Sequence, residues 1–396
     1  MPIPTPFFPR IEPLCTSRLY KDWAGYHAVR SYRTHHEAEY YAFRHAAGMI
    51  DVTPLFKYDV RGPDSVRLLA RLMARNVARL KQGQVYYLCW CDDDGKVIDD
   101  GTVSRIEDTH YRVTSADPAL HWFVRHARGF DVRVDDVTAS IAALSVQGPY
   151  ARDVVDHATG GAVSALKFFH LTRARIGATD VIVTRTGYTG DLGFEIWVAN
   201  DGAIGVWDAV MESGRPYGLL PCGLDAMDVT RIEAGFILNG VDYFSALHAM
   251  IDTRKASPYE LGLGWAVQLK RASFIGRDAL RREKAGGSAR TFVGLEYDWD
   301  ETEALFREHG LPPDVPSGAW RDGRPVYDPS GRFIGQATSG AWSPVLKRSL
   351  ALATVNSRFG AEGTRVRIEV TVEYERRTVT ATVVRRPFFD PERKRA

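Results

Sequence analysis

The chain lacks the residues that mark secreted, disulfide-rich or zinc-binding proteins. It has only four cysteines in 396 residues, and no two of them form a C-x-x-C pair. Cys89 and Cys91 lie two residues apart, on one face of an expected strand, a poor geometry for a local disulfide and too few ligands for zinc. We therefore expect a reduced, cytoplasmic protein without a metal centre, whose cysteines are small core residues (Cys15, Cys89, Cys91 and Cys222).

Long apolar runs, strong net charge and phosphate-binding glycine loops are missing as well. No apolar stretch approaches a membrane span, and the beginning MPIPTPFFPRIEP lacks the charged and apolar regions of a signal peptide. A formal charge of +2 gives no general argument for nucleic acid, and we expect ERKRA (392–396) to be a solvated terminus. Neither G-x-G-x-x-G nor a Walker A loop occurs, which argues against a dinucleotide or nucleoside triphosphate enzyme. We expect no membrane and no nucleic-acid partner.

The length predicts two or three domains, because 396 residues exceed a single ordinary core. Residues 1 to about 20 are rich in proline and predict an extended arm. Helices and strands alternate after it, which favours α+β domains with mixed or antiparallel sheets. The periodicity predicts helices at 34–47, 65–80, 119–127, from about 151, 202–213 and 224–234, and strands at 50–64, 86–90, 102–106, 111–114, 142–146, 174–185 and 194–198.

The last hundred residues have a different pattern. Charge, glycine and proline predict linkers at 284–288 and 299–322, and the remainder reads as short strands with glycine turns and no helix. Such a pattern is typical of a small β-barrel. We therefore divide the chain into an N-terminal α+β segment with its arm (1–140), a second α+β segment that completes the site (141–285) and a C-terminal barrel (290–396).

The segment GYTGDLGFE (187–195) is the most informative stretch of the sequence. Its glycines and the Thr-Gly-Asp step predict a tight, exposed reversal, after which an apolar run resumes. Glu195 falls inside that run, where a charge is costly unless something pairs with it. A carboxylate at the root of a hairpin suits a ligand with two adjacent N–H donors, such as a pterin. An ordinary hairpin with Glu195 pointing to solvent fits this stretch equally well.

Seven segments occur in a fixed order along the chain: IDVTPLFKYDVRGPD (50–64), GKVIDDGTV (95–103), SVQGP (145–149), TRTGYTGDLGFEIW (184–197), RIEAG (231–235), SPYELGLGWAVQLKRASFIGRDAL (257–280) and IGQATSGAWSPVLKRSLALA (334–353). Together they resemble the glycine-cleavage T-protein family of tetrahydrofolate-dependent aminomethyltransferases, over about residues 33 to 390. The form VIDDGTVSR is closest to demethylase-like or sarcosine-type members. The resemblance implies a three-domain cloverleaf of the α+β class, with tetrahydrofolate in a central channel.

The resemblance also implies roles for individual residues. Asp100 matches the family's catalytic carboxylate beside folate N5, and Glu195 matches the carboxylate that holds the pterin. The positions expected to line the folate site are Tyr188, Tyr87, Thr114 and Ser115. The chemistry agrees, because N5 gains positive charge as it accepts a one-carbon unit and a fixed carboxylate can stabilise that charge or remove a proton.

The acidic turn admits a plainer interpretation. D-D-D-G usually means a turn held by aspartate hydrogen bonds, and we favour this for Asp92 to Asp94. Asp100 has the like-charged neighbour Asp99, and such crowding can raise a carboxylate pKa toward the working range. Arg231 and Glu233 are as compatible with ion pairs to other partners as with catalysis. For Trp265 and Trp342, core packing is the simpler expectation than a place in the channel wall.

Two departures from the family pattern affect the expected substrate. The family usually carries an arginine where this chain has Met227, before Asp228, and a hydrophobic residue where it has Gly101. A cation for an anionic substrate or a folate carboxylate is therefore missing at that site. The N-terminal part offers aromatic faces for a sulfonium or ammonium donor, or a general acid for an aryl ether. The substrate candidates are Tyr26, His27 and Tyr32, with Tyr40 and Tyr41 as further aromatic faces.

The sequence thus predicts a tetrahydrofolate-dependent transferase of one-carbon metabolism. The leading hypothesis is a demethylase that moves a methyl or methylene group from a small methylated donor to N5 of tetrahydrofolate. One alternative is a glycine-cleavage-type aminomethyltransferase acting on a lipoyl carrier protein, a partner that we do not favour at this point. The other is a non-catalytic folate-binding regulator, although the K-G-C-Y-x-G-Q-E segment of such relatives does not occur here.

Overall fold

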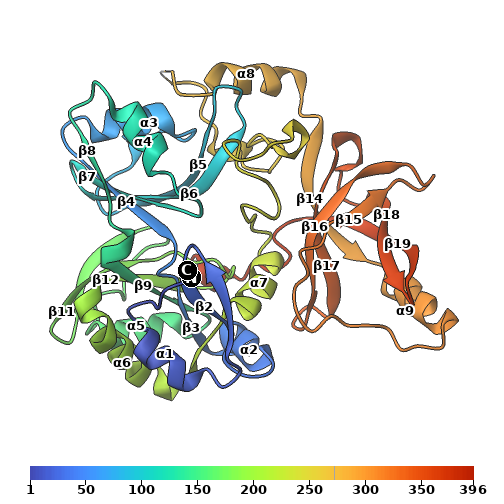
Figure 1. Cartoon of the computed structure of the whole chain (residues 1–396), viewed down its shortest axis with the longest axis horizontal. Coiled ribbons are helices and arrows are strands. Elements are labelled where there is room, and N and C mark those ends of the chain that lie inside the picture. The colour runs from blue at the N-terminus through green and yellow to red at the C-terminus, as the bar shows by residue number, and fades with distance from the viewer. Residues whose placement is uncertain (272) are drawn as a thin grey trace.

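The computed structural model describes residues 1–271 and 273–396, so Ala272, within the segment 257–280, lies outside the described residues. Figure 1 shows two sheet-containing bodies stacked on one side of the molecule and a barrel on the other, with α7 (Leu224–Glu233) where the three meet. The chain end lies near this junction. The predicted α+β cloverleaf with a C-terminal barrel is confirmed.

The first body is a six-stranded sheet with the order β10-β11-β12-β9-β3-β13. Apolar side chains of α6 and α5 pack on it. Phe7, which directly precedes α1, also joins this core, and its ring lies 5.8 Å from that of Trp207. The elements are α1 (Phe8–Leu14), β3 (Ala47–Asp51), β9 (Ile141–Gln147), α5 (Ala151–Ala158), β10 (Leu171–Ile176), β11 (Thr179–Thr184), β12 (Gly193–Ala199), α6 (Ala203–Gly214) and β13 (Leu219–Pro221). The arm predicted to be extended therefore contains a helix.

The second body is a five-stranded antiparallel sheet with the order β5-β6-β7-β4-β8. Leucines of α3 and aromatic residues of α4 form its core. The elements are β4 (Phe56–Arg61), α3 (Ser65–Leu72), β5 (Val85–Cys91), β6 (Val97–Glu107), β7 (His110–Ser115), α4 (Leu120–Ala127) and β8 (Arg133–Asp136). This sheet is an insertion into the first, because β3 before it and β9 after it pair with each other, Gly48 opposite Gln147.

Two predicted strands are each divided in the structure. The stretch 50–64 forms the end of β3 and then β4, which belong to different sheets, and the stretch 174–185 forms parts of both arms of the hairpin β10–β11. Gly177 at the turn of that hairpin has a φ of 58°, a conformation in which glycine carries no Cβ penalty. Alternation of apolar residues continues across both breaks, so the sequence pattern alone does not reveal them.

A third group of elements covers the junction. The hairpin β1 (Leu19–Trp23) and β2 (Tyr26–Ser31) lies beside α7, and Arg30 on β2 forms an ion pair with Asp225 on α7 at 3.0 Å. The helix α2 (Glu37–His45) lies nearby, and its Arg44 bonds Glu233 on α7. These contacts fix α7 against the six-stranded body.

The barrel closes through β14-β17-β16-β15-β18-β19. Its elements are α8 (Arg277–Gly286), which precedes it, β14 (Arg290–Tyr297), α9 (Trp299–Glu308), β15 (Arg324–Tyr327), β16 (Phe333–Ser343), β17 (Arg348–Asn356), β18 (Arg365–Val372) and β19 (Glu375–Val384). The linkers predicted at 284–288 and 299–322 are both partly helical, because α8 continues to Gly286 and α9 begins at Trp299. The signal for α9 was present: Asp298 caps the helix by accepting a hydrogen bond from the Glu301 amide at 3.0 Å.

The basic tail is docked, which corrects the prediction of a solvated terminus. Arg393 forms a two-pronged ion pair with buried Asp191, both N···O distances being 2.7 Å. The Ala396 carbonyl accepts a hydrogen bond from Arg152 at 2.8 Å. Forked arginine–carboxylate pairs fix geometry as well as adding energy. The tail therefore holds the segment 187–192 in place from outside.

The structure bears on the cysteines and on the composition as follows. All four cysteines are free and buried, as predicted. Among the described residues, no helix is long and apolar enough to cross a bilayer, and no cluster of three or more potential metal ligands occurs. The cytoplasmic location stays a prediction.

Candidate active site

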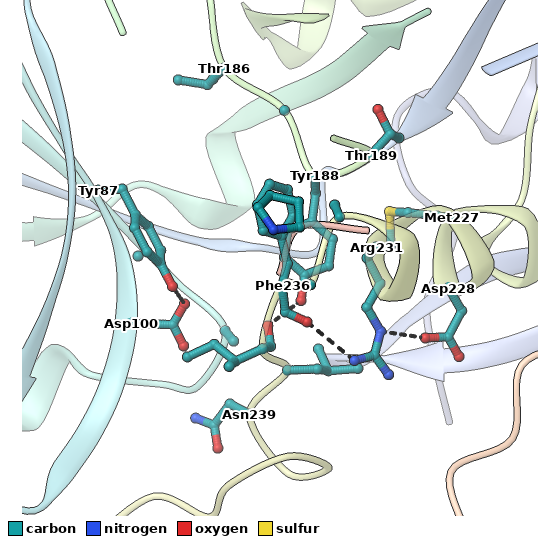
Figure 2. A pocket seen from close by; sticks show the side chains of 18 of the residues that line it. Tyr87, Asp100, Thr186, Tyr188, Thr189, Met227, Asp228, Arg231, Phe236 and Asn239 are labelled. Atoms are coloured by element: carbon teal, nitrogen blue, oxygen red, sulfur yellow. Dashed lines mark hydrogen bonds and ion pairs between the residues drawn. The ribbon is translucent and has the colours of Figure 1, made fainter. Parts of the chain in front are cut away.

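A cavity of about 1290 Å³ lies at the junction of the three bodies, and its lining draws on all of them. Asp100 comes from the five-stranded sheet, Glu195 from the six-stranded sheet, Arg231 from α7 and Arg321 from the segment that leads into β15. Ligand pockets typically measure about 300–1,000 Å³, so this cavity has room for more than one small molecule. Figure 2 shows Asp100 and Arg231 on opposite sides of Tyr188.

The carboxylate of Asp100 is held by two phenols. The hydroxyl of Tyr87 donates to its Oδ2 at 2.7 Å, and the hydroxyl of Tyr243 donates to its Oδ1. Burial raises the pKa of Asp100, and these two hydroxyls act against that rise because they favour the charged form. Asp100 therefore lines the cavity in a fixed orientation, and its pKa is raised by burial and lowered by the two hydroxyls.

Asp99 lies outside the lining and supports Asp100 from behind. Its Oδ2 accepts hydrogen bonds from the backbone amides of Ala116 at 3.0 Å and Asp117 at 2.9 Å. Its Oδ1 accepts from the Asn239 side chain at 2.9 Å. Burial, and then the charge of Asp100, raise the pKa of Asp99 to about 7. The neighbouring charge does raise a carboxylate pKa, as expected from the sequence. The pKa that it raises is that of Asp99, however, and burial contributes more to the rise than the charge of Asp100 does.

The backbone of this chain explains why position 101 is glycine. A Cβ atom built on it would lie 1.9 Å from the carbonyl oxygen of Thr114 on the neighbouring strand β7. The absent side chain lets β6 and β7 approach closely just beside Asp100. The hydroxyls of Thr102 and Thr114 lie 2.6 Å apart across the same pair of strands. The hydrophobic residue expected from the family at position 101 does not fit this backbone.

The segment between β11 and β12 is buried except at Gly187 and Tyr188, whereas the sequence suggested an exposed reversal. Its glycines leave room for the side chain of Gln147, since a Cβ on Gly187 or on Gly193 would lie within 2.3 Å of the Gln147 amide. Gln147 accepts a hydrogen bond from Thr189 at 3.0 Å. Gly190 takes a positive φ of 80°. The loop is thus shaped around one buried amide rather than around solvent.

Glu195 on β12 lies half-buried in the lining of the same cavity as Asp100. Burial raises the pKa of Glu195, while Thr186 and the charge of Lys57 act against that rise. Lys57 is itself buried, which lowers its pKa to about 8. No arginine or lysine pairs directly with Glu195 among residues 1–271 and 273–396. The carboxylate is therefore available to a ligand.

The other residues predicted to bind folate also line the cavity, and most of their polar groups already have partners within the protein. Tyr188 donates its hydroxyl to the Ile237 carbonyl, and its ring lies 5.6 Å from that of Phe236. Tyr87 lies 6.3 Å from Trp265 between ring centres. The hydroxyls of Thr114 and Ser115 are engaged within the protein, Ser115 with the Asp117 carbonyl at 2.7 Å. Their placement in the lining is established, and their roles stay predictions.

The arginine of RIEAG, Arg231, belongs to a network of ion pairs with Asp228, Asp242 and Arg321. Arg231 donates to Asp228 at 2.8 Å and to Asp242 at 2.7 Å. Arg321 donates to the second oxygen of Asp228 at 2.7 Å. Glu233 faces away from this network and binds Arg44 at 2.8 Å. Arg231 and Glu233 thus each have other ion-pair partners, which is the structural interpretation that the sequence left open.

The substrate candidates of the N-terminal part lie elsewhere. Tyr26, His27 and Tyr32 belong to or follow the hairpin β1–β2, and none of them lines the large cavity. Tyr32 is 4% exposed in the core of the first body. The His27 ring lies 6.2 Å from Phe8 on α1. Their aromatic character serves packing, and we do not carry their substrate roles forward.

Tyr40 and Tyr41 on α2 are also absent from the cavity lining. Tyr40 is buried and donates to Glu233 at 2.6 Å, so its phenol completes an ion-pair network. Tyr41 is 38% exposed and stacks on His45. Tyr40 contacts the face of α7 that carries Glu233, whereas Met227, Asp228 and Arg231 on α7 line the cavity. The sequence spacing of Tyr40 and Tyr41 does not show on which side of α7 they lie.

Sequence reasoning also missed residues that the structure brings to the site. Tyr243 and Asn239 contact the Asp99–Asp100 pair from a loop without regular structure. Their only signal was the segment NGVDY (239–243), which follows the apolar stretch AGFIL (234–238). Trp265 is 59% exposed and lines the cavity, which corrects the expectation of core packing. Trp342 instead packs against Trp299, with ring centres 5.1 Å apart.

Comparisons with known families agree with this geometry. Residues 15–271 match the model of the GCVT N-terminal domain, and residues 290–390 match that of the glycine cleavage T-protein C-terminal barrel domain. The chain belongs to the glycine cleavage T-protein family. It is an enzyme, a tetrahydrofolate-dependent transferase of one-carbon units, so the alternative of a non-catalytic regulator falls away.

Relatives match over nearly the full length of the chain. An aminomethyltransferase of Bacillus subtilis is 35% identical over 357 residues, which cover 89% of this chain and 90% of the relative. One of Symbiobacterium thermophilum is 35% identical over 368 residues, covering 90% of each chain. The crystal structure of glycine cleavage system aminomethyltransferase T from Bartonella henselae has the same fold, with a TM-score of 0.82, 23% identity and coverage of 98% and 99%.

The cavity suits the tetrahydrofolate that the family uses. Two carboxylates from different sheets line it, and a reduced pteridine presents several N–H donors to such groups. The Nη2 of Arg231 is buried and has no hydrogen-bond acceptor among the described residues, although Arg231 belongs to the lining. A buried donor of this kind is costly without a partner. The site thus offers carboxylate acceptors to an incoming ligand.

Proposed function

We propose that this protein transfers the carbon of an aminomethyl group, carried by a lipoyl carrier protein, to N5 of tetrahydrofolate. The observation that carries the proposal is the placement of Asp100 and Glu195 in the lining of one cavity. The relatives at 30–35% identity that bear the name aminomethyltransferase support this donor over a small methylated molecule. The carrier that the sequence did not favour is therefore the better hypothesis.

Asp100 is the proposed catalytic residue. Tetrahydrofolate, when bound, supplies N5 as the atom that accepts the one-carbon unit. A carboxylate fixed beside that nitrogen can take its proton or balance its positive charge as the new bond forms. The two phenols of Tyr87 and Tyr243 prevent Asp100 from turning away from the cavity. Preorganisation of this kind removes a reorganisation cost at the moment of reaction.

Glu195 is the proposed anchor of the pterin ring. A carboxylate that accepts two adjacent N–H groups fixes both the position and the rotation of a planar ring. Lys57 stabilises the charged form of Glu195 without occupying its oxygens. Tyr188, Tyr87, Thr114 and Ser115 are proposed to line the same site. Because Glu195 and Asp100 belong to different sheets, a ligand held by both would bridge the two bodies.

A small methylated donor remains a second candidate, because the cavity has aromatic walls. Tyr87 and Trp265 form one face, and Tyr188 and Phe236 form another. Such faces attract ammonium and sulfonium groups. The thioether of Met227 adds to the apolar lining. This candidate differs from the first in its product, 5-methyltetrahydrofolate rather than 5,10-methylenetetrahydrofolate.

Product analysis separates the two candidates. The enzyme is incubated with tetrahydrofolate and either an aminomethylated lipoyl carrier protein or a panel of methylated sulfonium, amine and aryl-ether compounds. We expect 5,10-methylenetetrahydrofolate and ammonia only with the carrier. Formation of 5-methyltetrahydrofolate from a small donor would establish the second candidate. The absence of any folate product, with folate binding intact, would contradict the proposed activity.

A further inference from the structure

One end of the cavity is lined by three segments that are distant in sequence. Lys21 comes from β1, Met227 from α7 and Arg321 from the segment that joins α9 to the barrel strands. Figure 2 shows Met227 and Asp228 on this side, beyond Arg231 and across the cavity from Asp100. Met227 carries no charge, so the positive charge at this end comes from other segments. Neither Lys21 nor Arg321 has a role in the function proposed above.

Arg321 is oriented by a single strong contact. Its Nε donates to Asp228 at 2.7 Å, while the other oxygen of Asp228 accepts from Arg231. The terminal nitrogens of Arg321 have no hydrogen-bond partner among the residues that the structure describes. Its side chain is 34% exposed. An arginine fixed at Nε, with its fork free and facing a cavity, is suited to bind a carboxylate.

Lys21 adds a second positive charge at the same place. No acidic side chain pairs with it within residues 1–271 and 273–396. Lys21 is exposed, but partial desolvation lowers its pKa, and the charge of Arg321 lowers it further, against the opposing charges of Asp228 and Asp225. Arg321 has Asp228 as its counter-ion, and its charge still acts beyond that pair on Lys21. Geometry and electrostatics therefore agree that this end of the cavity favours an anion.

The acidic groups nearby are largely occupied. Asp225 is paired with Arg30, and Asp22, which also lines the cavity, accepts a hydrogen bond from the Gly25 amide at 2.8 Å. Asp228 is shared between two arginines. Asp22 weakens the positive field without cancelling the free donors of Arg321. The effect of removing one cation should therefore be moderate.

We propose that Lys21 and Arg321 form a carboxylate-binding subsite at this end of the cavity, supplied by the N-terminal hairpin and by the barrel body. The inference rests on the proposed function, since the carboxylate belongs to one of its two ligands. It is the glutamate of tetrahydrofolate if the donor is the lipoyl carrier; under the second candidate function, a carboxylate on the small methylated donor is the other source. The subsite makes the barrel a contributor to ligand binding and explains how the chain dispenses with a cation at Met227.

The test compares two ligands that differ in the glutamate with its two carboxylates; tetrahydropteroate ends in a benzoate and has no glutamate. Binding of tetrahydrofolate and of tetrahydropteroate, which lacks the glutamate, is measured by calorimetry for the wild type, Arg321→Gln and Lys21→Gln. If the glutamate is the source, each variant loses about tenfold in affinity for tetrahydrofolate and none for tetrahydropteroate, the effect of one lost charge-assisted hydrogen bond. Arg324→Gln is the matched control, because Arg324 stacks on Trp320 and does not line the cavity.

A second arm identifies a donor carboxylate. If both variants bind tetrahydrofolate normally, KM is compared for methylated amines with and without a carboxyl group. A rise of KM for the carboxylated amine alone, with kcat unchanged, assigns the subsite to the donor.

Three results would overturn the subsite: no change in either arm, an equal loss for tetrahydropteroate, or the same loss in Arg324→Gln. Thermal unfolding of each variant excludes a folding defect. Failure of the wild type to bind tetrahydrofolate at all would count against the proposed function instead.

Discussion

The two carboxylates that line the cavity are held in contrasting ways. Asp100 accepts hydrogen bonds from two tyrosines and is backed by Asp99, which is itself bonded by backbone amides and Asn239. Glu195 has only the distant charge of Lys57 and nearby polar atoms. One carboxylate is fixed by the protein, and the other is left for a ligand to fix. This difference suggests that Asp100 acts on the reacting atom and that Glu195 selects what is bound.

The supports of the two sites also differ in origin. Those of the Asp99–Asp100 pair come from strand β5 and from the loops after α7 and after β7, so the position of Asp100 depends on several segments. Those around Glu195 come from neighbouring strands and from the buried loop wrapped around Gln147. That loop is in turn held by the tail through Asp191 and Arg393. Changes at the first site should alter rate, and changes at the second should alter affinity.

The largest effect is expected from Asp100→Asn. The amide keeps the size of the side chain but cannot take a proton, so kcat should fall by about 10² or more, the usual range for a general base. Affinity for tetrahydrofolate should stay within a few-fold. Steady-state kinetics and calorimetry measure the two quantities. Asp94→Asn, on the exposed turn of the same hairpin, is the control. Unchanged turnover in Asp100→Asn would remove Asp100 from the mechanism.

Glu195→Gln should produce the opposite pattern. A neutral amide cannot accept two N–H groups from a pterin, and the lost charge-assisted bonds should weaken tetrahydrofolate binding by about 10- to 100-fold. At saturating folate, kcat should change much less. Glu369→Gln, on a barrel strand away from the cavity, serves as control. A loss of kcat without a loss of affinity would reverse the roles assigned to the two carboxylates.

The raised pKa of Asp99 should make the free energy of unfolding depend on pH. Its pKa of about 7 lies above the ordinary 3.8, so the folded protein binds this proton more tightly than the unfolded chain. The resulting stabilisation is full below pH ~4 and is lost as the pH rises through 7. Relative to Asp99→Asn, the wild type should therefore lose about 4 kcal/mol of unfolding free energy between pH 4 and 8, because a shift of about 3 pKa units is worth about 1.4 kcal/mol per unit. Urea titrations at several pH values measure this difference, and a constant difference would contradict the raised pKa.

Tyr243→Phe should have the smallest effect, a few-fold loss of kcat. The phenol donates to Asp100 and favours its charged form, so its removal should raise the pKa of Asp100 and move the acid limb of the pH–rate profile upward. Tyr87→Phe should shift it in the same direction. Tyr86→Phe is the control, because Tyr86 points to Arg75 and away from the cavity. An upward shift of the basic limb instead would mean that Asp100 works in its protonated form, and a shift of the acid limb to lower pH would contradict the effect assigned to the Tyr243 hydrogen bond.

The sequence was informative where local pattern and local structure coincide. Alternating residues gave most strands, and the all-β pattern gave the barrel. Asp100 and Glu195 could be singled out because each follows a short, recognisable motif. The sequence was misleading where a pattern continues across a break, as at β3 and β4, or where a capping residue such as Asp298 lies in a charged stretch. Glycine-rich loops were also ambiguous, because glycine serves a buried approach to Gln147 as readily as an exposed turn.

By itself, the sequence determined the class of fold, the family and the two carboxylates, since these depend on short-range periodicity and on motifs of a few residues. Only the tertiary structure decided that Tyr243 bonds Asp100, that Arg321 reaches the cavity from the barrel, and that Tyr26 and Tyr32 do not. Such contacts join segments up to hundreds of residues apart, and no local pattern records which of many polar side chains will meet. Their geometry follows from how the sheets, α7 and the barrel pack together around the cavity.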